Sequence, residues 1–77
     1  MSERQHFIKQ LLEVTGVRRD YLATRCRVSE EYYDFQLDLA DEMDFDLFQK
    51  TLKHIHFLCK PEYQLIIEPR LLSAHKN

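Results

Sequence analysis

The stretch RCRVSEEYYDFQLD, residues 25–38, decides the fold of this 77-residue chain. Val28 and Ser29 follow a segment that suits a short helix, and two glutamates come directly after them. Serine is a favoured helix N-cap, and the helix dipole stabilises negative charge in the first turn. We therefore predict a turn before Ser29 and a helix from about Glu30 to Leu37.

Upstream of this stretch, two amphipathic segments predict two more helices. The first opens with Ser2 and Gln5, which have the spacing of a capping box, and closes near Gly16, a favoured C-terminal cap. Its apolar residues recur at the spacing of one helix face over about residues 3–14. The second covers about residues 20–26, with its apolar residues inward and its arginines outward.

Downstream, residues 47–59 carry the strongest amphipathic stripe and predict a long helix that ends before Pro61. The aspartates of MDFD at 43–46 mark the break before it, because aspartate competes with the helical backbone for hydrogen bonds. Beyond the proline, YQLIIE at 63–68 is compatible with a short β-strand, and SAHKN at 73–77 is expected to fray.

These elements predict an all-α fold, a compact bundle of four to five helices with the short C-terminal β-strand as an open addition. One glycine, two prolines and 44% apolar residues fit a folded helical chain better than a disordered or all-β one. We expect residues 1–60 to form a helical domain and residues 61–77 to form a C-terminal extension.

The composition also narrows the cellular setting. No apolar run approaches the roughly 18 residues of a membrane span, and the N-terminus is charged where a signal peptide would be apolar. Cys26 and Cys59 lack CxxC spacing, so both are interpreted as buried apolar groups rather than a disulfide or zinc site. We expect a cytoplasmic protein without membrane contact.

Motifs that carry catalysis or bind metal are scarce in this chain. It has no glycine-rich loop and no nucleophile motif, and its length leaves little room for a pocket beside a core. On a helix, His54 and His56 point to different sides, so only His56 and Cys59 share a face, and a closed zinc site needs four ligands. We expect no enzyme activity, no metal and no cofactor.

Charge is separated along the chain, although the net charge is only −2. Every charged residue between Glu30 and Gln49 is acidic, namely Glu30, Glu31, Asp34, Asp38, Asp41, Glu42, Asp44 and Asp46. Basic residues lie on either side of this block: Arg18, Arg19, Arg25 and Arg27 before it, and Lys50, Lys53 and Lys60 after it. This separation predicts an acidic face next to basic ones.

Six positions around the opening stretch resemble the Cro-repressor (XRE-like) type of helix-turn-helix. They are Gly16, Val17, Leu22, Ala23, Val28 and Ser29. In that family the alanine lets two helices cross tightly, while the leucine and valine fill the small core between them. LADEMDFDLF at 39–48 is similar to the family's next element, so the resemblance spans residues 5–58 and implies a helix-turn-helix regulator.

Several positions depart from this family pattern. Arg27 stands where the turn usually has a glycine, and an L-residue adopts the left-handed conformation only at some cost. Tyr33 stands where the family has an aliphatic residue and Gln36 where it has an apolar residue one turn later, so the register of the third helix stays open. The positions that in the family face bases and phosphates map to Glu30, Glu31 and Asp34. Carboxylates accept hydrogen bonds only from cytosine N4 among the base edges, and they repel phosphate.

Our first hypothesis is therefore a protein-binding regulator on a helix-turn-helix scaffold. An acidic, aromatic face would bind a basic DNA-binding protein such as a repressor, as small phage antirepressors and DNA mimics do, with aromatic side chains as anchors. The partner-binding residues would be Glu30, Glu31, Tyr32, Asp34, Phe35 and Asp38. The competing interpretation is a solvated helix face whose aromatic residues belong to the core.

The second hypothesis is a Cro-like, sequence-specific DNA-binding repressor that acts as a dimer. Its phosphate contacts would be Arg18, Arg19, Arg25 and Arg27. The strand at 63–68 would pair two subunits, because an exposed strand edge readily accepts another strand. The sequence leaves the partner, the operator and the oligomeric state open.

Overall fold

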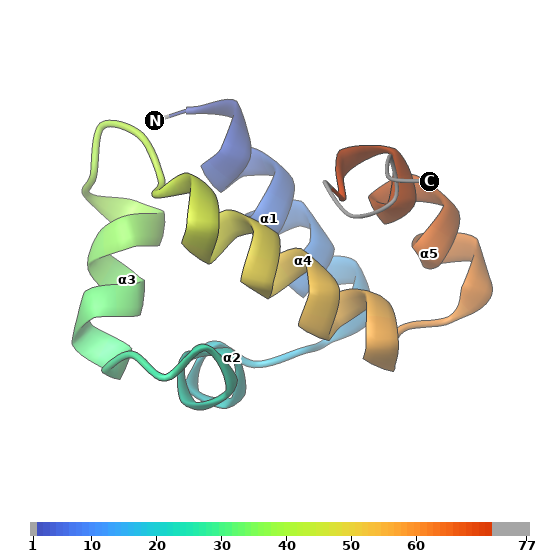
Figure 1. The fold of residues 1–77 in the computed structure, drawn as a ribbon, viewed down its shortest axis with the longest axis horizontal. Helices are drawn as coiled ribbons and strands as arrows, with labels where there is room; N and C mark the ends of the chain where they lie inside the picture. Colours follow the sequence, from blue (N-terminus) through green and yellow to red (C-terminus); the bar gives the residue numbers. More distant parts are fainter. Residues whose placement is uncertain (1, 72–77) are drawn as a thin grey trace.

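A computed structural model describes residues 2–71, which form five α-helices and a final 3-10 turn (Figure 1). The elements are α1 (Glu3–Thr15), α2 (Arg19–Cys26), α3 (Glu30–Asp38), α4 (Phe45–Leu58), α5 (Pro61–Ile67) and η1 (Glu68–Arg70). The all-α prediction is confirmed. In Figure 1, α2 is seen end-on and α3 from the side, so the two helices cross steeply.

One apolar core joins all five helices. Its buried members are Ile8, Leu11, Leu22, Ala23, Cys26, Tyr33, Leu37, Met43, Leu47, Phe48, Leu52, Ile55, Ile67 and Leu71. The stripe predicted for the long helix is buried from Leu47 to Ile55, whereas Leu58 at its end is partly exposed. Asp44, in the predicted break, caps α4 by accepting a hydrogen bond from the Leu47 N–H at 3.0 Å.

Gln5 ties the start of α1 to the end of α3. Its Oε1 accepts a hydrogen bond from the Ser2 N–H, as the capping box predicts. Its Nε2 donates to the backbone carbonyls of Gln36 at 2.8 Å and Ala40 at 2.7 Å. Because the side chain is fully buried, a single residue satisfies three backbone groups that have little access to water.

The strand predicted at residues 63–68 is wrong, because this segment is helical. Pro61 occupies the first turn of α5 after an extended Lys60, a position that suits its fixed φ and does not need its missing N–H. The Gln64 Nε2 donates to the His56 carbonyl at 2.8 Å, and Ile67 is buried in the core. The segment SAHKN at 73–77, expected to fray, lies outside the described residues.

The turn between α2 and α3 depends on a left-handed residue. Arg27 has φ 63° and ψ 42°, and it is the sole non-glycine with positive φ among residues 2–71. Its N–H donates to the Thr24 carbonyl at 3.1 Å, and the Val28 N–H donates to the Ala23 carbonyl at 3.0 Å. The expected glycine-like turn is therefore present with an arginine in it.

Replacing Arg27 with glycine should raise the free energy of unfolding by about 0.5–1 kcal/mol. Glycine removes a left-handed cost of about 1–2 kcal/mol, offset in part by its greater freedom in the unfolded chain. Urea unfolding of both proteins measures the difference. As the control, Arg25→Gly in the last turn of α2 should lower stability by about 1 kcal/mol. If Arg27→Gly were less stable than the native protein, the left-handed backbone of Arg27 would not be strained.

Candidate protein-interaction surface

The third helix, α3, turns one side to the core and the other to solvent. Tyr33 and Leu37 are fully buried, and Gln36 is nearly so. Tyr32 and Phe35 point outward, with 43% and 47% of their surface exposed. The register that the sequence left open therefore places Tyr33 in the core and Tyr32 on the surface.

The buried side of α3 is held by a polar contact inside the core. The Tyr33 hydroxyl lies 2.9 Å from the Thr51 Oγ1, and the Cys26 Sγ lies 4.0 Å from the same oxygen. Burial raises the pKa of both Tyr33 and Cys26. The phenol and the thiol therefore stay protonated, and these residues hold α2, α3 and α4 together rather than act as nucleophiles.

The two glutamates at the start of α3 point into solvent. Ser29 caps the helix by accepting a hydrogen bond from the Tyr32 N–H at 3.1 Å, so the first turn is firmly placed. Glu30 and Glu31 are exposed, and neither forms an ion pair with a basic residue in the described part of the chain. Their charge is available to a partner.

The two aspartates further along α3 are already paired within the protein. The Arg19 guanidinium donates to the Asp34 Oδ1 at 3.1 Å and to both Asp38 oxygens at 2.8 and 3.2 Å. Lys9 approaches Asp38 from α1, with its Nζ at 2.9 Å. These pairs link α3 to α2 and α1, so the six predicted partner-binding residues divide into an exposed set and a set that holds the scaffold.

The ion pairs of Asp38 with Arg19 and Lys9 should make the free energy of unfolding depend on pH in the acid range. Hydrogen bonds from Arg19 and then from Lys9 lower the pKa of Asp38 to about 2 from its ordinary value of 3.8. The folded state thus binds fewer protons than the unfolded state between these values, so the stabilisation is complete above about pH 4 and is lost as the pH falls to about 2.

We therefore expect Asp38→Asn to be less stable than the native protein at pH 7 by up to about 1 kcal/mol, because the carboxylate is partly exposed and screened. The difference should shrink as the pH falls through this window. Urea midpoints at a series of pH values measure it. Asp41→Asn, which changes an exposed carboxylate without a recorded ion pair, is the control and should stay near the native value. A constant gap down to pH 2 would contradict the pairing.

The four arginines predicted to contact phosphate fall into two groups. Arg18 pairs with Asp20 at 3.1 Å, and Arg19 is held by the aspartates of α3. Arg25 instead lies over the Tyr21 ring, 5.6 Å from its centroid, and Arg27 is exposed in the turn. Within residues 2–71, neither Arg25 nor Arg27 forms an ion pair. Of the four arginines, these two could therefore bind an anion without breaking an ion pair.

The outward face of α3 extends beyond the residues that sequence reasoning selected. Leu39, directly after the helix, is 75% exposed. It lies four residues after Phe35 and seven after Tyr32, so spacing along one helix face was the signal that could have found it. Tyr32 also borders a cleft of about 210 Å³ next to Asp44 and Asp46 at the start of α4. Aromatic and apolar surface therefore lies among the carboxylates.

The histidine and cysteine residues of α4 have structural contacts. The His56 Nε2 lies 2.9 Å from Glu68 Oε2, and the Cys59 Sγ donates to the His56 carbonyl at 3.8 Å. Residues 2–71 contain no group of three or more histidine, cysteine, aspartate or glutamate side chains that could hold a metal ion. Over the same residues, no helix has the length and apolar character needed to cross a membrane.

Comparisons with protein-family models, with curated proteins and with solved structures gave no match to this chain. The evidence on function is therefore the surface itself. Its distinguishing features are exposed glutamates without ion pairs, exposed aromatic rings on the same helix, and arginines of which two are paired with aspartates of the same chain.

Proposed function

We propose that this protein is a small non-enzymatic regulator that binds a basic DNA-binding protein, such as a repressor, through the outward face of α3. The observation that carries the proposal is the combination of Glu30 and Glu31, exposed and without ion pairs, with the exposed rings of Tyr32 and Phe35 on the same helix. A DNA-binding surface is basic by necessity, so it complements this face in charge.

The internal ion pairs support a protein partner over DNA. A protein that binds DNA gains affinity by neutralising phosphates with lysine and arginine. Here Arg18 and Arg19 are already occupied by aspartates, and phosphate would have to displace them. A duplex that approached the start of α3 would also meet Glu30 and Glu31, and like charges across an interface are unfavourable.

The two kinds of residue have different tasks in this proposal. Exposed ion pairs contribute at most about 1 kcal/mol each, so the glutamates chiefly steer and select a basic partner. Affinity depends more on aromatic side chains that become desolvated at the centre of an interface. Tyr32, Phe35 and Leu39 are placed for this because they line one side of α3 and its end.

The test measures binding to a purified basic helix-turn-helix repressor, best chosen as one encoded beside this gene, and competition by its operator duplex. Glu30→Lys with Glu31→Lys should weaken binding at least about tenfold, since it places like charges across the interface. Glu13→Lys with Glu62→Lys is the matched control, with the same charge change at exposed positions of α1 and α5. Equal losses in both variants, or no loss in either, would overturn the proposal.

The alternative function is a Cro-like DNA-binding repressor. The observation that favours it is the α2–turn–α3 arrangement, with a left-handed residue where the resembled family has glycine and with Arg25 and Arg27 outside any recorded ion pair. Binding to a duplex at low salt that is lost in Arg25→Glu with Arg27→Glu would support it. Arg19→Glu is less informative, because it also breaks the contacts to α3.

A homodimer through residues 63–68 would take a different form from strand pairing, because the segment is helical. Leu65 is 71% exposed on α5, and Ile66 is 52% exposed beside it. An apolar helix face of this kind can pack against its own copy around a two-fold axis. Sedimentation of the native protein and of Leu65→Glu distinguishes a dimer on this face from a monomer.

A further inference from the structure

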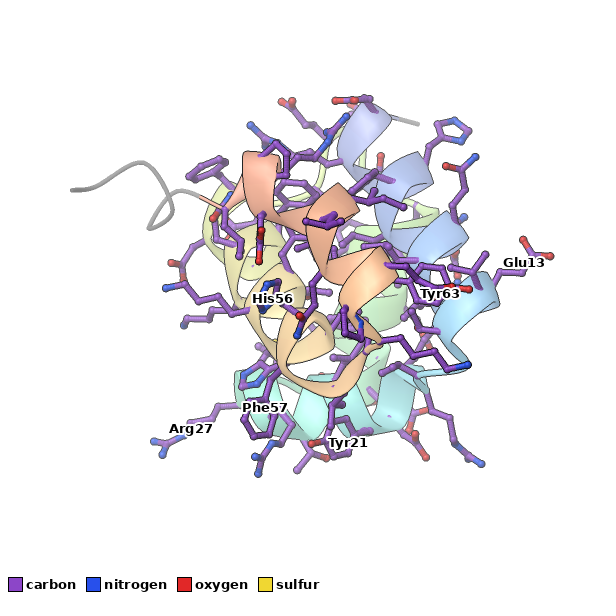
Figure 2. The ribbon with its side chains drawn as sticks, turned by 90° about the vertical axis from the view of Figure 1, so that its right-hand side faces the viewer. Glu13, Tyr21, Arg27, His56, Phe57 and Tyr63 are labelled. Carbon is purple, nitrogen blue, oxygen red and sulfur yellow. The ribbon has the colours of Figure 1, made fainter. Side chains whose placement is uncertain are left out.

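A second surface, away from the outward face of α3, carries the opposite charge. It consists of Tyr21 and Arg25 on α2, Arg27 in the following turn, and Lys53 and Phe57 on α4, and we call it the basic–aromatic surface. Figure 2 shows Arg27, Phe57 and Tyr21 along one edge of the molecule, where α2 passes below the end of α4. Lys53 precedes Phe57 by one helical turn, so both lie on the same side of α4.

The positive charge of this surface is not neutralised from within. Arg25, Arg27 and Lys53 form no ion pair with a carboxylate among residues 2–71. His54, next to Lys53, has its pKa lowered by burial and then by the charge of Arg25 on α2. Three cations therefore share one solvent-facing area.

The same surface exposes an unusual amount of apolar side chain. Phe57 is 81% exposed, more than any other large apolar residue of the described chain. Tyr21 is 38% exposed, and it also lines a shallow groove of about 300 Å³ with Leu58, Gly16, Val17 and Arg18. Exposed aromatic rings close to unpaired cations are typical of an interaction site rather than of inert surface.

We propose that the basic–aromatic surface binds a short acidic segment of a partner protein. The segment packs a large apolar side chain against the exposed rings of Tyr21 and Phe57, and its carboxylates meet Arg25, Arg27 and Lys53. The fit follows from charge complementarity around an apolar centre, the arrangement by which protein interfaces combine selectivity with affinity.

The position of the acidic residues favours a short peptide over nucleic acid. Glu30 lies three residues after Arg27, and Asp20 precedes Tyr21 directly. A nucleic acid that followed the arginines carries a charge on every nucleotide and would meet these carboxylates, whereas a peptide can place uncharged residues beside them. The basic–aromatic surface shares no residue with the outward face of α3, so this inference goes beyond the proposed function.

The test is fluorescence anisotropy with the full chain and a labelled peptide DEDFEDLD, in parallel with a labelled oligothymidylate. We expect the peptide to bind and Arg25→Glu with Lys53→Glu to weaken binding at least about tenfold. Phe57→Ala should weaken it about fivefold or more, because the ring packs against the apolar anchor. Lys60→Glu, just before α5, and Val14→Ala, at an exposed apolar position of α1, are the controls, and they should bind as the native protein does.

Three outcomes would overturn the inference: no binding of the peptide, equal losses in the control variants, or tighter binding of the oligothymidylate with the same sensitivity to Phe57→Ala. The last result would assign the surface to single-stranded nucleic acid. Glu30→Lys with Glu31→Lys should not weaken peptide binding, because it removes negative charge near Arg27. The same double variant tests the proposed function through its binding to the repressor. The two proposals can therefore fail independently of each other.

Discussion

Replacing Gln5 with leucine is expected to lower the free energy of unfolding by about 2–4 kcal/mol. The two side chains are similar in size, so the loss measures hydrogen bonds rather than a cavity. Leucine would leave the carbonyls of Gln36 and Ala40 and the N–H of Ser2 without their partner. Buried polar groups that lose a partner bear most of their desolvation penalty, about 1–3 kcal/mol each, and partial access to water limits the sum.

Urea unfolding followed by far-ultraviolet circular dichroism measures this change, since most of the described chain is helical. Gln10→Leu, at an exposed position of the same helix, is the matched control and should change stability by less than about 0.5 kcal/mol. If Gln5→Leu behaved like this control, the link between α1 and α3 would contribute nothing.

Gln5 also shows where sequence reasoning reaches its limit. Its spacing from Ser2 predicted the capping box, because that contact is local and has a fixed pattern. The carbonyls that receive its Nε2 lie 31 and 35 residues away. No local pattern reports such a contact, since it exists only after α1 and α3 have packed. The helix was therefore predictable from its cap, and the link between helices was not.

The strand predicted at residues 63–68 was wrong for a different reason. Its β-branched and aromatic residues favour a strand by composition, but β-propensity depends strongly on context. Pro61, treated only as the end of α4, is also a good first residue for a new helix. Packing of Ile67 against the core then stabilises a helix of seven residues that would be marginal alone.

The charges of α3 were predictable in sign but not in pairing. The acidic run from Glu30 to Asp38 suggested one continuous face. The crossing of α2 over α3 brings Arg19 against the last two carboxylates and leaves the first two exposed. Their separation depends on the crossing of two helices rather than on neighbours in the chain, so the candidate surface became smaller and better defined once the fold was known.

Replacing Tyr33 with alanine is expected to have the largest effect on stability, a loss of about 3–5 kcal/mol. The side chain is fully buried at the junction of α2, α3 and α4, so its removal leaves a cavity and leaves the Thr51 hydroxyl with only its weak contact to the Cys26 thiol. Domains of this size have a total stability of about 4–12 kcal/mol, by the usual stability per residue. Thermal unfolding by circular dichroism should therefore show a variant close to its melting temperature at 37 °C.

Tyr33→Phe separates the ring from its hydroxyl. It should cost about 1–2 kcal/mol, because Thr51 then retains only the weak contact with the Cys26 thiol. Thr51→Val should rescue part of this loss when combined with Tyr33→Phe, since both partners of the hydrogen bond are then removed together. Additive losses in the double variant would show that the two groups do not interact.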